Sequence, residues 1–441
     1  MRMVLFLLLA SMLITPATAS DFDEPNIIPP FSTGSSNWSM FKKDLSHSGF
    51  TTDAVNPPLV LKWTFYLGFD TDSSPIIVDD VLYIGSNGGI HAIDAKSGRE
   101  LWRIQTNGFV KSVPTVVDGV LYIGPDDTRF YAIDIKDGAI KWIYKNSTGG
   151  YISSAAVVNN LAYVGSEDGS FYAFDVQTGE PTWQTLTGKV IESSPAVGER
   201  IITFGTNGGL VIALDAANGK EKWRYDTGIS DVKSSPVIRD GIIIIGSNDG
   251  SVYALTTDKG ALKWKYSTGS NVESSPSIKD GTIFVGSKDS NLYAIDSKTG
   301  ALKWKFMTGG YVDSSPAISN DVVYFGSRNN FIYALDTNTG KLLWRNSTGQ
   351  RDKDYITSPA IYGNMLYAAT HSGIVYAFSG AEVTPTATPA VTPTIRETTV
   401  TPTAIPALSP TVTPAKTQKA PGFELSLIIL LITVLIRKRL K

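Results

Sequence analysis

An aspartate recurs along the central part of the chain at a fixed distance before a tryptophan. It lies eight residues before the tryptophan in six copies, as Asp94, Asp134, Asp175, Asp215, Asp296 and Asp336. Paired carboxylates are common general acids and bases, but a carboxylate repeated in nearly every copy is too frequent for one active site. We expect these side chains to cap turns through Asx-type hydrogen bonds. Thr256 replaces the aspartate in one copy, where we expect a looser turn.

Other side chains that perform catalysis or bind metals are scarce. The 441 residues include no Cys, which excludes disulfides, thiolate metal sites and a cysteine nucleophile. Only three His are present, so a metal site would depend on carboxylates and carbonyls. The 39 basic and 41 acidic residues give a net charge of −2, and we expect no nucleic-acid partner.

Tryptophan marks the repeat that must position any site. It recurs at intervals of 39 to 41 residues, at Trp63, Trp102, Trp142, Trp183, Trp223, Trp264, Trp304 and Trp344. This period is typical of one blade of a β-propeller. A large ring on the outer strand of a blade can stack between neighbouring blades while its N–H finds a backbone acceptor. We therefore expect a structural role for these tryptophans and not a catalytic one.

Each period contains the same four segments. A Ser-Ser-Pro motif opens the first, and an alternating apolar segment, a Tyr-Ala-Ile/Leu-Asp segment and the Trp segment follow, separated by turns that contain Gly. Alternation with a period of two between such turns predicts a four-stranded meander. The first-strand motif occurs eight times, at Pro75, Pro114, Ala155, Pro195, Pro236, Pro276, Pro316 and Pro359.

These counts predict an all-β, eight-bladed β-propeller over residues 61–380. The last copy ends near Phe378 without a Trp segment of its own, whereas the Trp segment at residues 61–65 precedes the first copy. We expect this N-terminal strand to complete the eighth blade, because a closed ring removes the free sheet edge of an open array. Seven or nine blades are the alternatives.

Both ends of the chain differ from the repeats in composition. Residues 1–19 combine Arg2, an eleven-residue apolar run and small residues at 17–19, which predicts a secretory signal peptide. An N-terminal membrane anchor is the alternative, although the run is shorter than the about 20 residues that span a bilayer. Residues 20–60 are an N-terminal segment. Residues 383–420 are rich in Thr and Pro and predict an extended stalk.

Residues 421–441 resemble the PGF-CTERM sorting signal of archaeal surface proteins. Pro421, Gly422 and Phe423 precede an apolar run over 425–436 and a basic end. In that family an archaeosortase removes the tail and the new C-terminus is attached to a membrane lipid. The resemblance implies processing by signal peptidase and an archaeosortase, and a location on the extracellular face of the cell membrane. An uncleaved anchor is the alternative, although twelve residues span only about 18 Å of an about 30 Å core.

The repeat itself resembles that of pyrroloquinoline quinone (PQQ) propellers. The shared motif is Ala-x-Asp-x-x-x-Gly-x-x-x-Trp, found at 92–102 and 294–304, and residues 38–49 resemble the segment that precedes the first blade in that superfamily. Its dehydrogenases hold the quinone with a Trp floor, typically a vicinal Cys pair, and Ca²⁺. This chain has no Cys and no long insertion between blades. The repeat family also includes the propeller lipoprotein of bacterial outer-membrane assembly, which binds partner proteins without catalysis.

Strand alternation places two sets of connections on one face of such a propeller. These are the linker from each Trp strand to the next first strand and the turn between the second and third strands. The copies diverge there, with Phe69, Phe109, Tyr151, Tyr311 and Tyr355 in the linkers and Arg129, Lys288, Arg328 and His371 in the turns. Aromatic and basic groups together predict a surface that binds a protein loop or a glycan. A solvated rim with its aromatics packed between blades is the alternative.

A second series precedes each first-strand motif and is expected to ring the axis. It comprises Asp72, Lys111, Ile152, Glu192, Lys233, Glu273, Asp313 and Ile356. The signs partly alternate, so we expect neighbours to pair, with an ion in the channel as the alternative.

Three triplets match the acceptor pattern for N-glycosylation, at Asn37, Asn146 and Asn346. The last two are expected at equivalent, solvent-facing ends of Trp strands. His91 replaces the usual Tyr before Ala and is expected to be a half-buried strand residue and not a metal ligand.

Together these observations predict a non-enzymatic propeller, anchored at the cell surface, that binds a surface protein or a glycan and needs no cofactor. The alternative is an exported dehydrogenase that uses PQQ with Ca²⁺.

Overall fold

Each sequence repeat forms four antiparallel strands whose burial follows their position in the blade. The inner three strands are rich in Val, Ile, Tyr and Ala, because neighbouring blades cover both faces of the sheet. Strand β20 (Ile242–Ser247) is buried along its whole length. The outer strand β22 (Leu262–Ser267) instead begins with exposed residues and then alternates.

The computed structural model describes residues 36–349 and 354–380, and its regular elements are all strands. The predicted signal peptide, stalk and sorting signal lie outside the described residues. The chain divides into units at 1–383 and 384–441, and all of the described residues belong to the first unit. Within the described part, no helix has the length and apolar character needed to cross a membrane.

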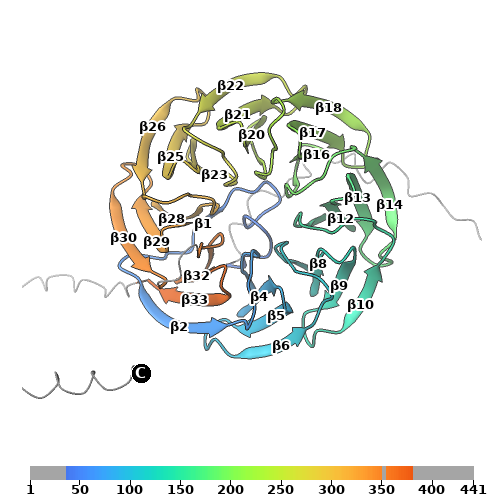
Figure 1. The fold of residues 1–441 in the computed structure, drawn as a ribbon, viewed down its shortest axis with the longest axis horizontal. Coiled ribbons are helices and arrows are strands. Elements are labelled where there is room, and N and C mark those ends of the chain that lie inside the picture. Colours follow the sequence, from blue (N-terminus) through green and yellow to red (C-terminus); the bar gives the residue numbers. More distant parts are fainter. Residues whose placement is uncertain (1–35, 350–353, 381–441) are drawn as a thin grey trace, which may run out of the picture. The chain divides into compact units, whose positions relative to one another are not determined.

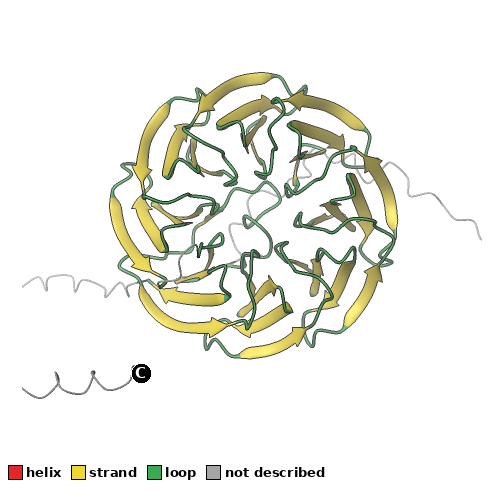
Figure 2. Ribbon diagram, viewed as in Figure 1, coloured by secondary structure: helices red, strands yellow, loops and turns green. Residues whose placement is uncertain are grey.

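Eight sheets surround a central axis, seven with four strands and one in which a short fifth strand joins the four of the blade (Figures 1 and 2). Written from inner to outer strand, blades 1 to 4 are β3 (Ile76–Val78), β4 (Val81–Ser86), β5 (Gly89–Asp94), β6 (Glu100–Ile104); β7 (Thr115–Val117), β8 (Val120–Ile123), β9 (Phe130–Asp134), β10 (Ile140–Tyr144); β11 (Ala156–Val158), β12 (Leu161–Gly165), β13 (Ser170–Asp175), β14 (Pro181–Leu186); and β15 (Ala196–Gly198), β16 (Ile201–Gly205), β17 (Leu210–Asp215), β18 (Glu221–Asp226).

Blades 5 to 8 are β19 (Val237–Arg239), β20, β21 (Ser251–Thr256), β22; β23 (Ser277–Lys279), β24 (Thr282–Gly286), β25 (Asn291–Asp296), β26 (Leu302–Met307); β27 (Ala317–Ser319), β28 (Val322–Ser327), β29 (Phe331–Asp336), β30 (Leu342–Ser347); and β31 (Ala360–Tyr362), β32 (Met365–Ala369), β33 (Ile374–Ser379), β2 (Val60–Tyr66). The predicted all-β, eight-bladed propeller is confirmed.

The ring closes in blade 8, where strands from the two ends of the propeller pair. Strand β2 lies antiparallel to β33, with Val60 opposite Ser379 and Tyr66 opposite Ile374. The N-terminal strand therefore completes the last blade, as predicted. The short strand β1 (Phe50–Thr51) adds to blade 7 by pairing in parallel with β27.

The repeated Ser-Ser-Pro motif links the blades around the axis. The second Ser of each motif accepts a hydrogen bond from the backbone N–H of the same position one blade earlier, at 2.8–3.0 Å. The donor and acceptor pairs are Val113 to Ser154, Ser154 to Ser194, Ser194 to Ser235, Ser235 to Ser275, Ser275 to Ser315, Ser315 to Ser358 and Ser358 to Ser74. The last bond joins blade 8 to blade 1. The ring of bonds has one gap, since the position after Ser74 is Val113 and has no hydroxyl.

The tryptophans fill the outer part of the seams between blades. Six indole N–H groups donate to a backbone carbonyl of the next blade at 2.8–3.0 Å, from Trp63, Trp102, Trp142, Trp223, Trp264 and Trp304. The Trp183 N–H is buried without a partner among the described residues. A glycine of the next blade lies against the ring, and at Gly260 a Cβ atom would come within 2.4 Å of Trp223.

The N-terminal segment at residues 38–51, here called the channel segment, crosses the centre of the ring (Figure 1). Inner strands present unpaired backbone N–H groups to the channel, and this segment supplies acceptors. Carbonyls of Trp38, Ser39, Leu45, Ser46, Ser48 and Gly49 accept from Ile77, Val116, Val197, Ile238, Ile278 and Ile318 at 2.8–3.0 Å. The segment therefore contacts the inner strands of six different blades, a role that its sequence did not predict.

His47 in the channel segment is buried and uncharged at neutral pH. Burial lowers its pKa to about 4, despite the hydrogen bond between Nδ1 and the Pro236 carbonyl at 2.9 Å. Because that carbonyl can only accept, Nδ1 carries the proton.

Two local expectations need correction. The turn after Thr256 is not looser, since it keeps the backbone bonds of Thr256 to Ala261 and Gly260 at 2.9 and 3.0 Å, and Thr256 Oγ1 accepts from Ala261 N–H. His91 is not half-buried. It is 1% exposed, and its ring bonds Ser86 and Glu100, so the blade accommodates it with polar partners.

The contact between glycine and tryptophan predicts a steric cost at each seam. We expect Gly260→Ala to lower the free energy of unfolding by about 3 kcal/mol, because the new methyl group meets the Trp223 ring and the residue has φ of +65°. The matched control is Gly188→Ala, where φ is +74° but no atom lies within 4 Å, and the expected loss is about 1 kcal/mol. Equal losses in chemical denaturation would show that the ring contact contributes nothing.

Candidate functional site

Linkers and turns together form one face of the propeller, here called the linker face. It comprises the linker after each outer strand and the turn between the second and third strands of each blade. In all eight blades a turn N–H donates to a linker carbonyl at 2.8–3.0 Å, from Asn87, Asp126, Glu167, Asn207, Asn248, Lys288, Arg328 and His371. These hydrogen bonds hold each turn against a linker and thereby position the side chains of both segments.

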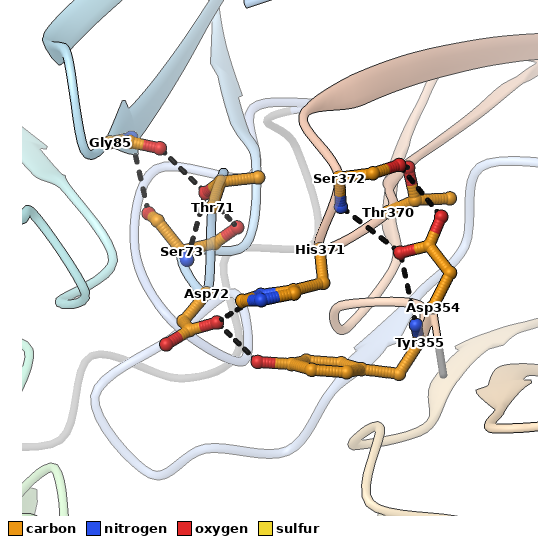
Figure 3. Close-up of polar contacts among 9 residues, drawn as sticks. All are labelled: Thr71, Asp72, Ser73, Gly85, Asp354, Tyr355, Thr370, His371 and Ser372. Atoms are coloured by element: carbon orange, nitrogen blue, oxygen red, sulfur yellow. Dashed lines mark hydrogen bonds and ion pairs between the residues drawn. The ribbon is translucent and has the colours of Figure 1, made fainter. Parts of the chain in front are cut away.

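Four of the nine residues predicted to line this face meet where blades 7, 8 and 1 adjoin. Figure 3 shows two of them, Tyr355 and His371, with their rings parallel beside Asp72. The rings stack at 4.7 Å between centroids. Asp72 accepts from the Tyr355 hydroxyl and, at 2.8 Å, from His371 Nδ1. Burial and the Asp72 carboxylate raise the pKa of Tyr355, so its phenol stays protonated and donates.

Arg328 and Tyr311 extend this cluster into solvent. The Arg328 guanidinium lies over Tyr355 at 4.7 Å and over Tyr311 at 6.0 Å from the ring centroids. Its Nε donates to Asp313, a carboxylate whose pKa is raised by burial and lowered in part by Arg328 and Lys288. Tyr311 is 49% exposed. The arrangement holds a cation between two aromatic rings with its remaining N–H groups available to a ligand.

Further hydrogen bonds hold together the backbone segments beside the cluster (Figure 3). Asp354 accepts from the N–H and the hydroxyl of Ser372 at 3.0 and 2.7 Å, and His371 N–H donates to the Tyr355 carbonyl at 2.8 Å. Thr71 N–H donates to the His371 carbonyl. These hydrogen bonds join the last linker, the turn between β32 and β33, and the first linker of the ring. Asp354 and Ser372 were not predicted, because only the aromatic and basic residues of this face were considered from the sequence.

The other predicted residues of this face lie elsewhere. Phe69 is 44% exposed in the first linker and packs over Gly88. Phe109 and Arg129 belong to blade 2, and Lys288 pairs with Glu273 at 2.7 Å in blade 6. Tyr151 was wrongly placed on the surface. It is fully buried and packs against Phe130 and Tyr172, as in the alternative of aromatics packed between blades.

Acidic side chains around the axis are already bonded within the protein. The expected pairing of neighbours in this series occurs between Glu192 and Lys233. The other bonds go to side chains of turns and linkers: Asp72 with His371 and Tyr355, Glu192 with Asn207, Glu273 with Lys288 and Asn248, and Asp313 with Arg328. No group of three or more His, Asp or Glu side chains placed to hold a metal occurs in the described ranges. Asp313 Oδ1 is nevertheless buried without a hydrogen-bond partner among the described residues.

The three predicted glycosylation sites differ in their surroundings. Asn146 is exposed and follows β10. Asn346 lies within β30, half-buried, with its amide on the Ser347 carbonyl at 3.0 Å, so the two sites are not equivalent as expected. The difference arises because Asn146 lies four residues after Trp142, whereas Asn346 lies only two residues after Trp344. Asn37 exchanges hydrogen bonds with Asp79 at 3.1 Å.

Comparison with protein families finds one that covers most of the chain. The family described as outer membrane protein assembly factor BamB matches residues 32–190, 167–304 and 268–392. None of the curated proteins matches the chain.

Solved structures with the same architecture come from proteins of different kinds. BamB from Moraxella catarrhalis has a TM-score of 0.63 at 18% identity, over 73% of this chain and 99% of that one. Quinohemoprotein alcohol dehydrogenase from Comamonas testosteroni has 0.69 at 14% identity, over 78% and 81%. The computationally designed Ika8 protein has 0.63 at 17% identity, over 74% and 99%. At these identities the likeness shows the fold alone.

The ion pair beneath the cluster can be tested by a double-mutant cycle. We expect Arg328→Ala to lower the free energy of unfolding by about 1–3 kcal/mol, because it leaves the half-buried Asp313 carboxylate without its counter-ion. The loss should be largest at neutral pH and shrink in acid, since the raised pKa of Asp313 lets the carboxylate take up a proton there.

Asp313→Asn is the matched background, in which Arg328→Ala should cost much less. A loss that is the same in both backgrounds and at both pH values would contradict the pairing.

Proposed function

The chain belongs to the family described as outer membrane protein assembly factor BamB, and from that premise we propose that it is a non-enzymatic binding module of the cell surface whose linker face takes a partner protein. The observation that carries the proposal is the cluster of Tyr311, Arg328 and Tyr355. Tyrosine and arginine are enriched among the residues that dominate binding energy at protein interfaces. The ring stacking and the hydrogen bonds to Asp72 and Asp313 hold the side chains of Tyr355 and Arg328 in place before a partner arrives. Less conformational entropy is therefore lost on binding.

Exposed aliphatic side chains on the same face support a protein partner over a glycan. Ile229 is 98% exposed, Leu186 is 74% exposed and Met307 is 72% exposed, and all three lie in linkers or at outer-strand ends next to them. Aliphatic side chains of this kind bury area against another protein. A glycan at this face is the other ligand class that we consider.

The described part of the chain ends on the face opposite the linker face, so this end leaves the linker face uncovered. Ser379 ends β33 opposite Val60, and Gly380 N–H donates to the carbonyl of Asn364 in the turn after β31. That turn lies on the face opposite the linker face, so the chain leaves the propeller there.

A binding experiment tests the linker face. We expect a partner captured by cross-linking on the cell envelope to bind the purified protein saturably, and Arg328→Ala and Tyr311→Ala to weaken binding about ten- to thirty-fold. Lys305→Ala on the exposed outer strand β26 is the control and should leave the affinity unchanged.

Equal affinity in all four proteins would contradict the proposal. Saturable binding of PQQ with Ca²⁺, together with dye-linked oxidation of an alcohol, would favour the dehydrogenase instead.

The anchor is tested by the intact mass of the protein extracted from membranes. We expect a mass that lacks residues 1–19 and the tail after the stalk, with an added lipid. A retained basic end at 437–441 would contradict sorting and support an uncleaved anchor.

A further inference from the structure

A groove opens between blades 2 and 3 on the face opposite the linker face. Its cavity has a volume of about 470 Å³, and its lining includes Tyr122, Trp142, Val176 and Gln177. Ligand pockets in proteins commonly hold about 300–1,000 Å³. The corresponding seam between blades 3 and 4, lined by Tyr163, holds a cavity of only about 20 Å³.

The two seams differ in what the tyrosine hydroxyl of the second strand contacts. Tyr163 donates to the Ala216 carbonyl of the next blade at 3.0 Å, and Tyr367 in blade 8 donates to the Ala95 carbonyl at 3.0 Å. In blade 2 the same position is Tyr122, and the next blade carries the larger Val176 in place of Ala. The residue as a whole is 3% exposed, and its hydroxyl forms no hydrogen bond with any described residue, yet it is not one of the fully buried unpartnered atoms. The hydroxyl therefore still reaches solvent at the groove, where water or a ligand can bond it.

Further side chains of the groove also have unused hydrogen-bonding groups. Asp118, Asn159 and Gln177 line it, and none of these three side chains bonds another described residue. By contrast, Asn160 is held by Asp175 at 3.0 Å and Lys141 by Asp134 at 3.0 Å. Together with the Tyr122 phenol, these three side chains offer one carboxylate and two amides, so the groove can both accept and donate hydrogen bonds.

The floor of the groove is apolar. Val117, Val120, Val158 and Val176 are half-buried there beside the Trp142 ring. Many hydrophobic walls with a few placed polar groups are typical of small-molecule sites. A sugar ring matches this lining, because its C–H faces are apolar and its hydroxyls both donate and accept. From this we infer that the groove between blades 2 and 3 binds a small saccharide.

This site lies on the opposite face from the protein-binding cluster, so the two proposals can fail separately. The test is a titration of the purified protein with neutral mono- and disaccharides (glucose, galactose, mannose, N-acetylglucosamine, maltose and cellobiose), followed by calorimetry. We expect saturable binding of at least one sugar. Tyr122→Phe and Asp118→Asn should each weaken it about ten-fold, because the first removes a hydroxyl of the site and the second removes the charge of its carboxylate.

Two controls separate binding from folding. Tyr163→Phe removes the equivalent hydroxyl where the protein itself is the partner, and it should leave sugar affinity unchanged while lowering stability. Arg328→Ala should also leave sugar affinity unchanged. Tyr122→Phe should not lower the denaturation midpoint, because its hydroxyl has no partner among the described residues.

Three results would overturn the inference. One is the absence of binding by every sugar at tens of millimolar. Another is sugar binding that Tyr122→Phe and Asp118→Asn leave unchanged, which would place the sugar elsewhere. The third is binding of an extended peptide in place of sugars that is lost in the same variants, which would assign the groove to a peptide.

Discussion

The structure depends on closing a ring of eight sheets, none of which can bury its own faces. Each sheet is covered on both faces by the sheets of the neighbouring blades. An open array would therefore leave one face of the sheet at each end exposed to solvent. Closure comes from β2 pairing with β33 and from the Ser358 N–H bonding Ser74. The two contacts join residues about 284 to 319 positions apart in sequence. The pairing of β2 with β33 lies at the outer edge of blade 8, and the bond from Ser358 to Ser74 lies at the first-strand motif near the axis. Blade 8 is therefore held at both its outer and its inner edge.

Closure also creates the candidate site. Asp72 belongs to the first linker, whereas Tyr355 and His371 belong to the last blade, and they meet only because the ends of the ring meet. The repeat places similar linkers and turns at all eight positions, but the other seams carry pairs such as Glu273 and Lys288 that neutralise each other. The stacked cluster is confined to the point where the repeat is interrupted. Departures from a repeat are where a repeat protein can acquire a specific surface without losing its fold.

The sequence predicted the features that the repeat imposes, the closing strand of blade 8 and four residues of the cluster, but it missed features that depend on how the blades pack. The period of the tryptophans fixed the blade number, and strand alternation placed linkers and turns on one face. Tyr151 was misplaced because sequence position alone does not show whether a linker aromatic points outwards or into the seam. The channel segment was missed because it bonds six blades in turn and has no period of its own. The groove beside Tyr122, where Val176 takes the place of Ala, was missed because it forms between two blades and appears only once they are packed.

The claim most central to this account is that the two ends of the propeller hold its ring closed and thereby fix the linker face. Native-state hydrogen exchange of the amides in β2 (Val60–Tyr66) tests it most directly, with β22 of blade 5 as the counterpart whose chain connection is unbroken. The account predicts that β2 exchanges as slowly as β22, because both are released only when the ring opens. Rapid exchange in β2 while β22 stays protected would show that blade 8 opens by itself, and it would contradict the account.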